Sequence, residues 1–139
     1  MKTRFSSLVT LKKNTMDKSE KVLQSANADL NSATTALEVS YNSLSNIEIP
    51  KSGAASQFLA SRTLLDSQRG MIKHNQEWIE FAKNQVNLAK EKLKLDMIEH
   101  EKFKYLEVQE IKKILKEQKI KEAKELDEIA LLTYEKRER

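Results

Sequence analysis

One cluster of acidic residues and histidine is dense enough to raise the question of a metal site. Asp96, Glu99, His100 and Glu101 lie close together, and Asp96 and His100 have the i, i+4 spacing. On a helix this spacing places a carboxylate and an imidazole on one face, where both can bind a divalent cation. A complete site needs further ligands, but the chain has no cysteine and only two histidines. We therefore expect no metal ion at this cluster.

No other group of residues is typical of an active site. The sequence contains two glycines, so it has no glycine-rich loop of the kind that binds phosphate groups. It also lacks a Ser-His-Asp arrangement and a convergent pair of carboxylates, which perform nucleophilic and acid-base catalysis. We expect no catalytic residues, no cofactor and no enzymatic activity.

The composition indicates long helices and excludes two classes of partner. Charged residues make up 33% of the chain and aromatic residues 6%, and there is one proline, which is typical of a coiled coil. The basic residues are not gathered on one face between aromatics, so we expect no binding to nucleic acid. The longest apolar run is far shorter than the roughly 20 residues that span a bilayer. We expect a cytoplasmic protein without direct membrane insertion.

Two helices are predicted from the distribution of helix breakers. Residues 54–139 have no proline and are rich in Leu, Ile, Lys, Glu, Gln and Ala, which favours one continuous helix over about 54–136. Pro50 ends an earlier helix, predicted over about 5–46, and the turn spans about 47–53. A short connection between two long amphipathic helices makes them antiparallel. We therefore predict an all-α fold, a single elongated antiparallel two-helix coiled coil (αα-hairpin) over residues 1–139.

Both predicted helices carry an apolar residue at every seventh position, which is the pattern of a coiled-coil seam. The seam residues are Val9, Met16, Leu23, Leu30, Leu37 and Leu44, then Leu65, Ile72, Ile79, Val86 and Leu93 after an initial Phe58. Facing residues of an antiparallel pair have numbers with a constant sum, and pairing Leu44 with Phe58 and Val9 with Leu93 gives 102 throughout. This register places Lys2 and Arg4 opposite the acidic cluster, where ion pairing explains the cluster better than metal binding.

The heptad repeat stops after Leu93, so we expect an arm from about residue 98 onward that the first helix does not cover. An apolar stripe continues along this arm, and we predict that a partner covers it. The stripe residues are Met97, Val108, Ile111, Leu115, Leu126 and Ile129. A further line, Phe81, Leu88 and Leu95, points away from the seam. It is either a set of isolated surface residues, a groove for a partner or a face for self-association.

Both ends of the sequence resemble those of the flagellar export protein family FliJ. The segment Lys124–Ala130, with Leu126, Asp127, Glu128, Ile129 and Ala130, is similar to the carboxy-terminal signature of the family. Phe5, Leu8 and Leu11, which follow a basic residue and run into a charged helix, resemble its amino terminus. The resemblance covers the whole chain in length and layout.

The resemblance implies a non-enzymatic component of the flagellar type III protein export apparatus. Its expected fold is similar to the stalk subunit of rotary ATPases, and its open end is expected to bind the hexameric export ATPase FliI and to promote ATPase assembly and activity. Further expected partners are the cytoplasmic domain of the export-gate protein FlhA and export chaperones. The protein would lie peripherally at the cytoplasmic face of the inner membrane and be monomeric when alone.

Site residues follow from the resemblance. The expected ATPase-binding group is Phe5, Leu8, Leu126, Asp127, Glu128, Ile129 and Ala130, and the expected export-gate contact at the hairpin tip is Tyr41, Phe58 and Leu59. Two alternatives remain open. One is the equivalent stalk protein of a virulence type III secretion system, and the other is a generic coiled-coil tether or scaffold that dimerises through its arm.

Overall fold

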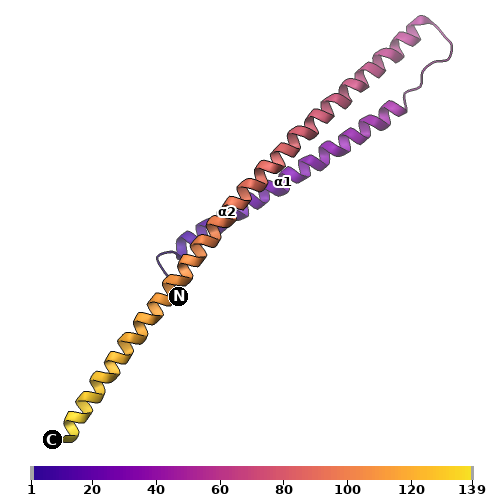
Figure 1. The fold of residues 1–139 in the computed structure, drawn as a ribbon. Coiled ribbons are helices and arrows are strands. Elements are labelled where there is room, and N and C mark those ends of the chain that lie inside the picture. Colours follow the sequence, from indigo (N-terminus) through magenta and orange to yellow (C-terminus); the bar gives the residue numbers. More distant parts are fainter. Residues whose placement is uncertain (1, 139) are drawn as a thin grey trace. The chain divides into compact units, whose positions relative to one another are not determined.

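The computed structural model describes residues 2–138 and consists of two long helices joined by one connection (Figure 1). Helix α1 covers Ser6–Ser45 and helix α2 covers Ala55–Glu138. No strand occurs between residues 2 and 138. The two helices pack against each other in antiparallel directions, which confirms the predicted all-α hairpin.

Local hydrogen bonds explain where α1 begins, and two residues that disfavour helix explain the connection after it. Before α1, the amide of Phe5 donates to Thr3 Oγ1 at 3.1 Å, and the amide of Thr3 donates to Ser6 Oγ at 2.8 Å. These hydroxyls satisfy donors that a helix start leaves free. The connection at residues 46–54 contains Pro50 and Gly53, and Gly53 has φ 143°, a conformation that side chains disfavour.

The contacts divide the chain into two compact units. The hairpin unit comprises Asp17–Leu95, and the arm unit combines the residues up to Met16 with those from Asp96 onward. The hairpin unit therefore contains the connection and the facing halves of the two helices. The arm unit contains the first turns of α1 and the second half of α2.

Small residues form the buried seam of the hairpin unit. On α1 every seventh residue from Ser19 is buried, namely Ser19, Ala26, Ala33 and Ser40, and Ala33 is 0% exposed. Ala26 packs with Val86 and Ala89 of α2, and Leu23 and Leu30 lie against this cluster. Small seam residues let two helix backbones approach closely. Apart from Phe58, all the apolar seam residues predicted above within the hairpin unit are buried or half-buried.

Hydrogen bonds between the helices define the register of the hairpin unit. Asn75 Nδ2 donates to Ser40 Oγ at 2.5 Å and to the carbonyl oxygen of Ala36 at 3.2 Å. Gln76 Nε2 donates to the hydroxyl of Tyr41 at 3.1 Å. The numbers of Ser40 and Asn75 add to 115, whereas the register expected from the sequence requires 102.

The predicted register, with Leu44 facing Phe58, is therefore wrong by about two heptads. A shift by whole heptads leaves the apolar repeat of each helix in the seam, so the repeat alone does not choose between the two registers. In the observed register α2 extends past the end of α1 at the connection (Figure 1). Every residue from 51 to 60 is exposed, and Phe58 is 40% exposed instead of forming a seam contact.

Contacts in the arm unit reach further along α2 than expected. Lys12 Nζ lies 3.7 Å from Glu99 Oε2 and 5.6 Å from the centre of the Phe103 ring, and Arg4 Nη2 lies 3.5 Å from Glu110 Oε2. His100 is buried. The prediction that α2 is uncovered from about residue 98 is therefore wrong, as is the pairing of Arg4 with the acidic cluster. The seam continues through charged and aromatic residues that a count of apolar heptads does not include.

Candidate binding surfaces

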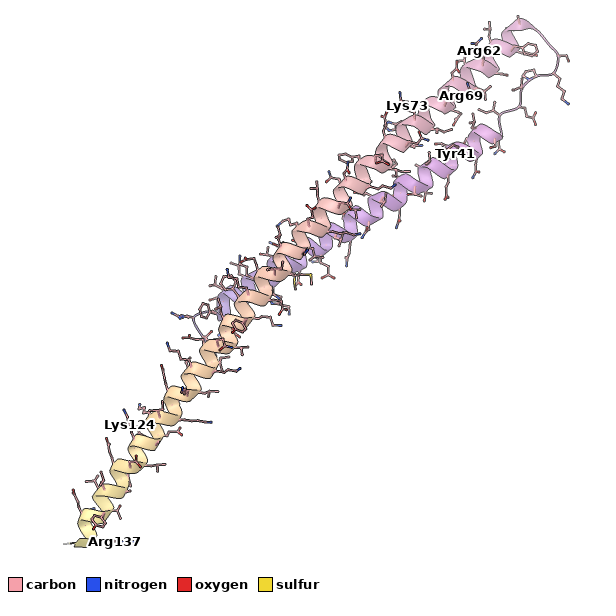
Figure 2. All side chains as sticks on the ribbon, viewed as in Figure 1. Tyr41, Arg62, Arg69, Lys73, Lys124 and Arg137 are labelled. Carbon is pink, nitrogen blue, oxygen red and sulfur yellow. The ribbon has the colours of Figure 1, made fainter. Side chains whose placement is uncertain are left out.

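The last part of α2 is the most open surface of the arm unit. Every residue from 115 to 137 is exposed. Around Lys124 side chains project from the helix in several directions (Figure 2). We call residues 115–137 the free arm. Because every residue of the free arm is exposed, the apolar side chains of Leu126 and Ile129 are accessible to a partner.

The free arm carries large apolar side chains in positions that face water. Leu126 is 66% exposed and Ile129 is 59% exposed. At 3.6 residues per turn, Leu115, Leu126 and Ile129 lie within about 60° of one another on the helix. Asp127, Glu128 and Ala130 are exposed beside them. This part of the expected ATPase-binding group therefore forms one apolar strip bordered by acidic side chains.

The amino-terminal part of the expected ATPase-binding group lies elsewhere in the arm unit. Phe5 is half-buried, with the Arg4 guanidinium 5.0 Å from its ring centre, and Leu8 is exposed. Arg4 contacts Glu110, which precedes Leu126 by 16 positions on the same helix. At about 1.5 Å per residue this separation is about 24 Å. The structure therefore does not bring Phe5 and Leu8 together with Leu126.

The earlier part of the predicted partner stripe borders the covered region of α2. Met97, Val108 and Leu115 are exposed, whereas Ile111 is half-buried. Ile111 directly follows Glu110, which contacts Arg4. The stripe is therefore open at most positions, and it continues onto the free arm at Leu115.

The predicted tip group is also spread along the hairpin unit. Phe58 and Leu59 are exposed on the first turns of α2, beyond the end of α1. Tyr41 is exposed as well, but its hydroxyl accepts a hydrogen bond from Gln76, 18 positions after Phe58. That separation is about 27 Å along α2. Phe58 and Leu59 therefore share one surface at the tip, and Tyr41 lies on another.

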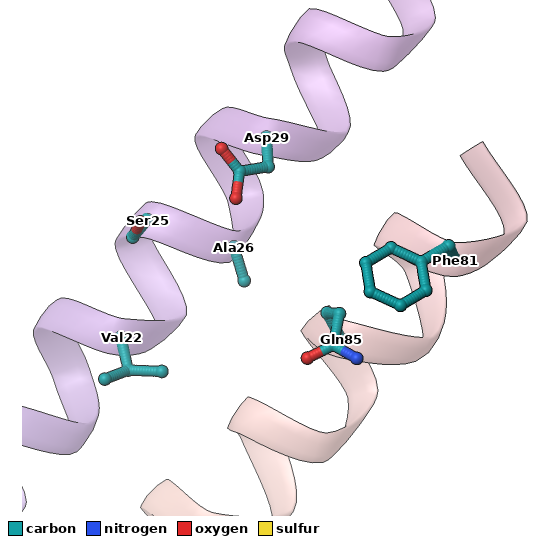
Figure 3. A pocket seen from close by; sticks show the side chains of 6 residues that line it. All are labelled: Val22, Ser25, Ala26, Asp29, Phe81 and Gln85. Atoms are coloured by element: carbon teal, nitrogen blue, oxygen red, sulfur yellow. The ribbon is translucent and has the colours of Figure 1, made fainter. Parts of the chain in front are cut away.

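A second apolar line on α2 borders the groove between the two helices of the hairpin unit. Phe81 lies beside a hollow lined also by Val22, Ser25, Ala26, Asp29 and Gln85 (Figure 3). An adjoining hollow is lined by His74, Glu77, Trp78 and Phe81. The exposed residues along this line are Leu64, Met71, Trp78, Phe81, Leu88 and Leu95. Phe81 follows Trp78 by three positions, which places both side chains on one face of α2.

The acidic cluster that raised the question of a metal site lies beside a basic side chain of α1. Glu99 of the acidic cluster lies against Lys12. Among residues 2–138 no group of three or more histidine, cysteine or acidic side chains could hold a metal ion. No helix of the described chain is long and apolar enough to cross a membrane.

Comparison with known families distinguishes a flagellar export protein from a generic coiled-coil tether. Residues 1–139 match the family described as Flagellar FliJ protein, so the match spans the entire sequence. The chain belongs to the flagellar FliJ family. No curated protein and no solved structure matched the chain.

Membership of the FliJ family confirms the resemblance seen at the two ends of the sequence. A FliJ-family chain is a non-catalytic component of the flagellar type III export apparatus, and it interacts with other components of that apparatus. In this FliJ-family chain the segments that carry the resemblance are the exposed strip at Leu126 and the half-buried start of α1 at Phe5. Both lie in the arm unit.

Proposed function

We propose that this FliJ-family chain is a stalk that binds the hexameric export ATPase, promotes its assembly and activity, links it to the export gate and escorts export chaperones. The observation that supports ATPase binding is the free arm, where every residue from 115 to 137 is exposed. Leu126 and Ile129 project from it and are mostly exposed. A flagellar export component with such an arm is equipped to bind another member of the apparatus.

The chemistry of the free arm favours a partner that buries two or three aliphatic side chains. Burying a leucine or isoleucine side chain fully contributes about 1.5–3 kcal/mol relative to leaving it exposed. Leu126 and Ile129 could together contribute a large part of a binding free energy, as the central residues of an interface do. Asp127 and Glu128 would lie at the edge of this contact and favour basic groups on the ATPase.

Phe5 and Leu8 form a second ATPase contact in this proposal. About 24 Å of helix separates Phe5 and Leu8 from Leu126, so a single small patch on the ATPase does not contact both groups. The ATPase would therefore bind the free arm with one surface and the start of α1 with another. Substitutions at Leu8 should weaken the complex independently of substitutions at Leu126.

The proposed contact with the export gate lies at the tip of the hairpin unit. Phe58 and Leu59 are exposed on the first turns of α2 and are suited to an apolar contact with the cytoplasmic domain of the export gate. Tyr41 would contribute only to a partner that also covers the flank at Gln76.

The experiment measures ATP hydrolysis by the purified flagellar export ATPase of the same bacterium, with and without this protein. The double variant Leu126→Asp, Ile129→Asp should abolish the stimulation, because two carboxylates would enter the apolar contact. The matched control is Ile120→Asp, Leu131→Asp, which makes the same changes at exposed positions on the opposite side of the free arm. The control should keep the stimulation, and circular dichroism should show the same helix content for both.

Undiminished stimulation by the Leu126, Ile129 double variant would contradict the site assignment. Sedimentation equilibrium separates the stalk from a generic tether. The stalk should be monomeric when alone, whereas a tether that pairs through its free arm should dimerise at micromolar concentration.

A further inference from the structure

The heptad repeats of the hairpin unit are compatible with two registers. In the observed register Asn75 lies opposite Ser40. In the alternative register α2 is displaced by two heptads, so that each residue of α1 faces a residue 14 positions earlier on α2. Both registers keep the same apolar positions in the seam, because the displacement is a whole number of heptads.

Apolar contacts alone would favour the alternative register. It would place Phe58 against Leu44 and would cover the first turns of α2 with α1. In the observed register those turns project beyond α1, and Phe58 remains 40% exposed. Some other interaction must therefore oppose the burial of this aromatic side chain.

The buried amide of Asn75 supplies that interaction. Asn75 is 5% exposed, and its Nδ2 donates to both Ser40 Oγ and the Ala36 carbonyl oxygen. In the alternative register Asn75 would face Ala26, whose side chain has no acceptor. Asn75 would then lose the Ser40 Oγ acceptor and keep at most a bond to a backbone carbonyl of α1, and a buried amide that lacks a partner is unfavourable, so the alternative register has a penalty that the observed one avoids.

The alanines of the seam act in the same direction. In the observed register Ala26 packs with Ala89 in the buried cluster, and by the same register the fully buried Ala33 lies opposite Ala82. In the alternative register Ala33 would face Gln68, a long polar side chain. The close approach of the helices at Ala33 would then bury a second amide.

We propose that the Ser40–Asn75 polar layer locks the hairpin in the register that leaves the first turns of α2 uncovered at the tip. The polar layer decides between two arrangements that the apolar repeat leaves nearly equivalent. A buried asparagine fixes the register of coiled coils in this way in general. In this chain the polar layer therefore determines whether Phe58 and Leu59 are exposed at the tip. Its effect extends beyond stability to the surface that the tip offers to a partner.

Disulfide trapping reports the register directly, because the natural chain has no cysteine. Tyr41 and Gln76 are in contact across the flank of the seam. One heptad further along, Thr34→Cys with Lys83→Cys should therefore report the observed register. Thr34→Cys with Arg69→Cys should report the alternative, since Arg69 precedes Lys83 by 14 positions. All three positions are exposed, so the cysteines leave the seam unchanged.

Each cysteine pair is placed in the full chain with Asn75 intact, with Asn75→Leu and with Asn75→Ala. With Asn75 intact, only the 34–83 pair should form an intramolecular disulfide. In both Asn75 variants the ratio of the 34–69 to the 34–83 disulfide should rise by about tenfold or more, as expected when a buried hydrogen-bonded group is removed. Asn84→Leu makes the same change at an exposed position of α2 and should leave the ratio unchanged.

The outcomes are distinct from those of the ATPase experiment, because they need no partner. An Asn75→Leu protein that keeps the helix content of the parent and still forms only the 34–83 disulfide would overturn the proposal. A 34–69 disulfide in the parent chain would overturn it as well, since the register would then not be locked. Asn75→Ala guards against an effect of the larger leucine side chain and should shift the ratio in the same direction.

Discussion

Replacing Val86 by alanine tests whether the narrow seam stabilises the hairpin unit. Val86 is 5% exposed and packs in the cluster with Ala26, Ala89, Leu23 and Leu30. The substitution removes two methyl groups from a site that water does not reach. Val22 makes a matched control on α1, because the same substitution there removes the same atoms from a residue that is 57% exposed.

The expected change at Val86 combines three contributions. Losing two buried methyl groups costs about 1.6 kcal/mol, at about 0.8 kcal/mol for each. The remaining cavity adds up to about 1 kcal/mol, depending on how far the helices close over it. Alanine has a higher helix propensity than valine, which raises the free energy of unfolding of the variant by about 0.5 kcal/mol. The free energy of unfolding should therefore fall by about 1–2 kcal/mol.

The same substitution at Val22 should not lower the free energy of unfolding. Its methyl groups are mostly in water, so the more favourable helix propensity of alanine at least offsets the smaller apolar area buried in the folded chain. We expect the free energy of unfolding to stay unchanged or to rise by a few tenths of a kcal/mol. Urea unfolding followed by the far-ultraviolet circular dichroism of α1 and α2 measures both variants, with the slope of the transition checked for constancy.

Equal losses of stability at Val86 and Val22 would refute the description of the seam. That result would mean either that α1 and α2 are separated at Val86 or that a second copy of the chain covers Val22. Repeating the measurement at two protein concentrations distinguishes the two, since only association makes the midpoint depend on concentration.

Two further predictions concern other parts of the chain. Gly70→Ala should raise the free energy of unfolding by about 0.5–1 kcal/mol, because Gly70 is inside α2 and no heavy atom lies within 4 Å of an added Cβ. Gly53→Ala should lower it by about 1 kcal/mol or more, because Gly53 has φ 143° and the new Cβ would meet the Gln57 side chain. Thermal unfolding compares both variants, and a destabilised Gly70→Ala protein would contradict the open space around Gly70. Ending the chain after Ile114 should change the free energy of unfolding by less than about 0.5 kcal/mol, since all of residues 115–137 are exposed. The same truncation should abolish ATPase stimulation. Retained stimulation would place the ATPase contact outside the free arm.

The hairpin could be predicted because its signals are local. Pro50 excludes a helix through the connection, and the absence of proline from residue 54 onward favours one long helix. The seven-residue repeat of leucines on α1 identifies the face that meets the partner helix. None of these signals depends on which residue of α2 faces which residue of α1.

The register could not be predicted from the apolar repeat because the decisive residues are polar or small. Matching large apolar residues favours Phe58 against Leu44, whereas the structure satisfies the amide of Asn75 at Ser40. Asn75 occupies a seam position, and a search for an acceptor across the seam would have identified Ser40. The wrong register also led to the early start predicted for the uncovered part of α2.

The division of the candidate site does not come from this error. The observed register places Phe5 and Leu8 about two heptads nearer to Leu126 than the predicted register did, and residues grouped by their family resemblance still lie on separate surfaces. The contacts of Lys12 and Arg4 with Glu99 and Glu110 depend on charge and on long side chains. Such contacts have little periodic signal, and sequence patterns do not place them.

The alanines and serines of the seam give the hairpin a graded resistance to opening. Each of these residues buries little apolar area, so no single layer concentrates the cohesion of the two helices. The layers around Ala26 and Ala33 have neighbours on both sides, whereas the last layers before the connection have a neighbour on one side only. Separation of the two helices therefore begins at the connection, beyond the Ser40–Asn75 layer, and the hydrogen bonds of Asn75 oppose its spread toward Ala26.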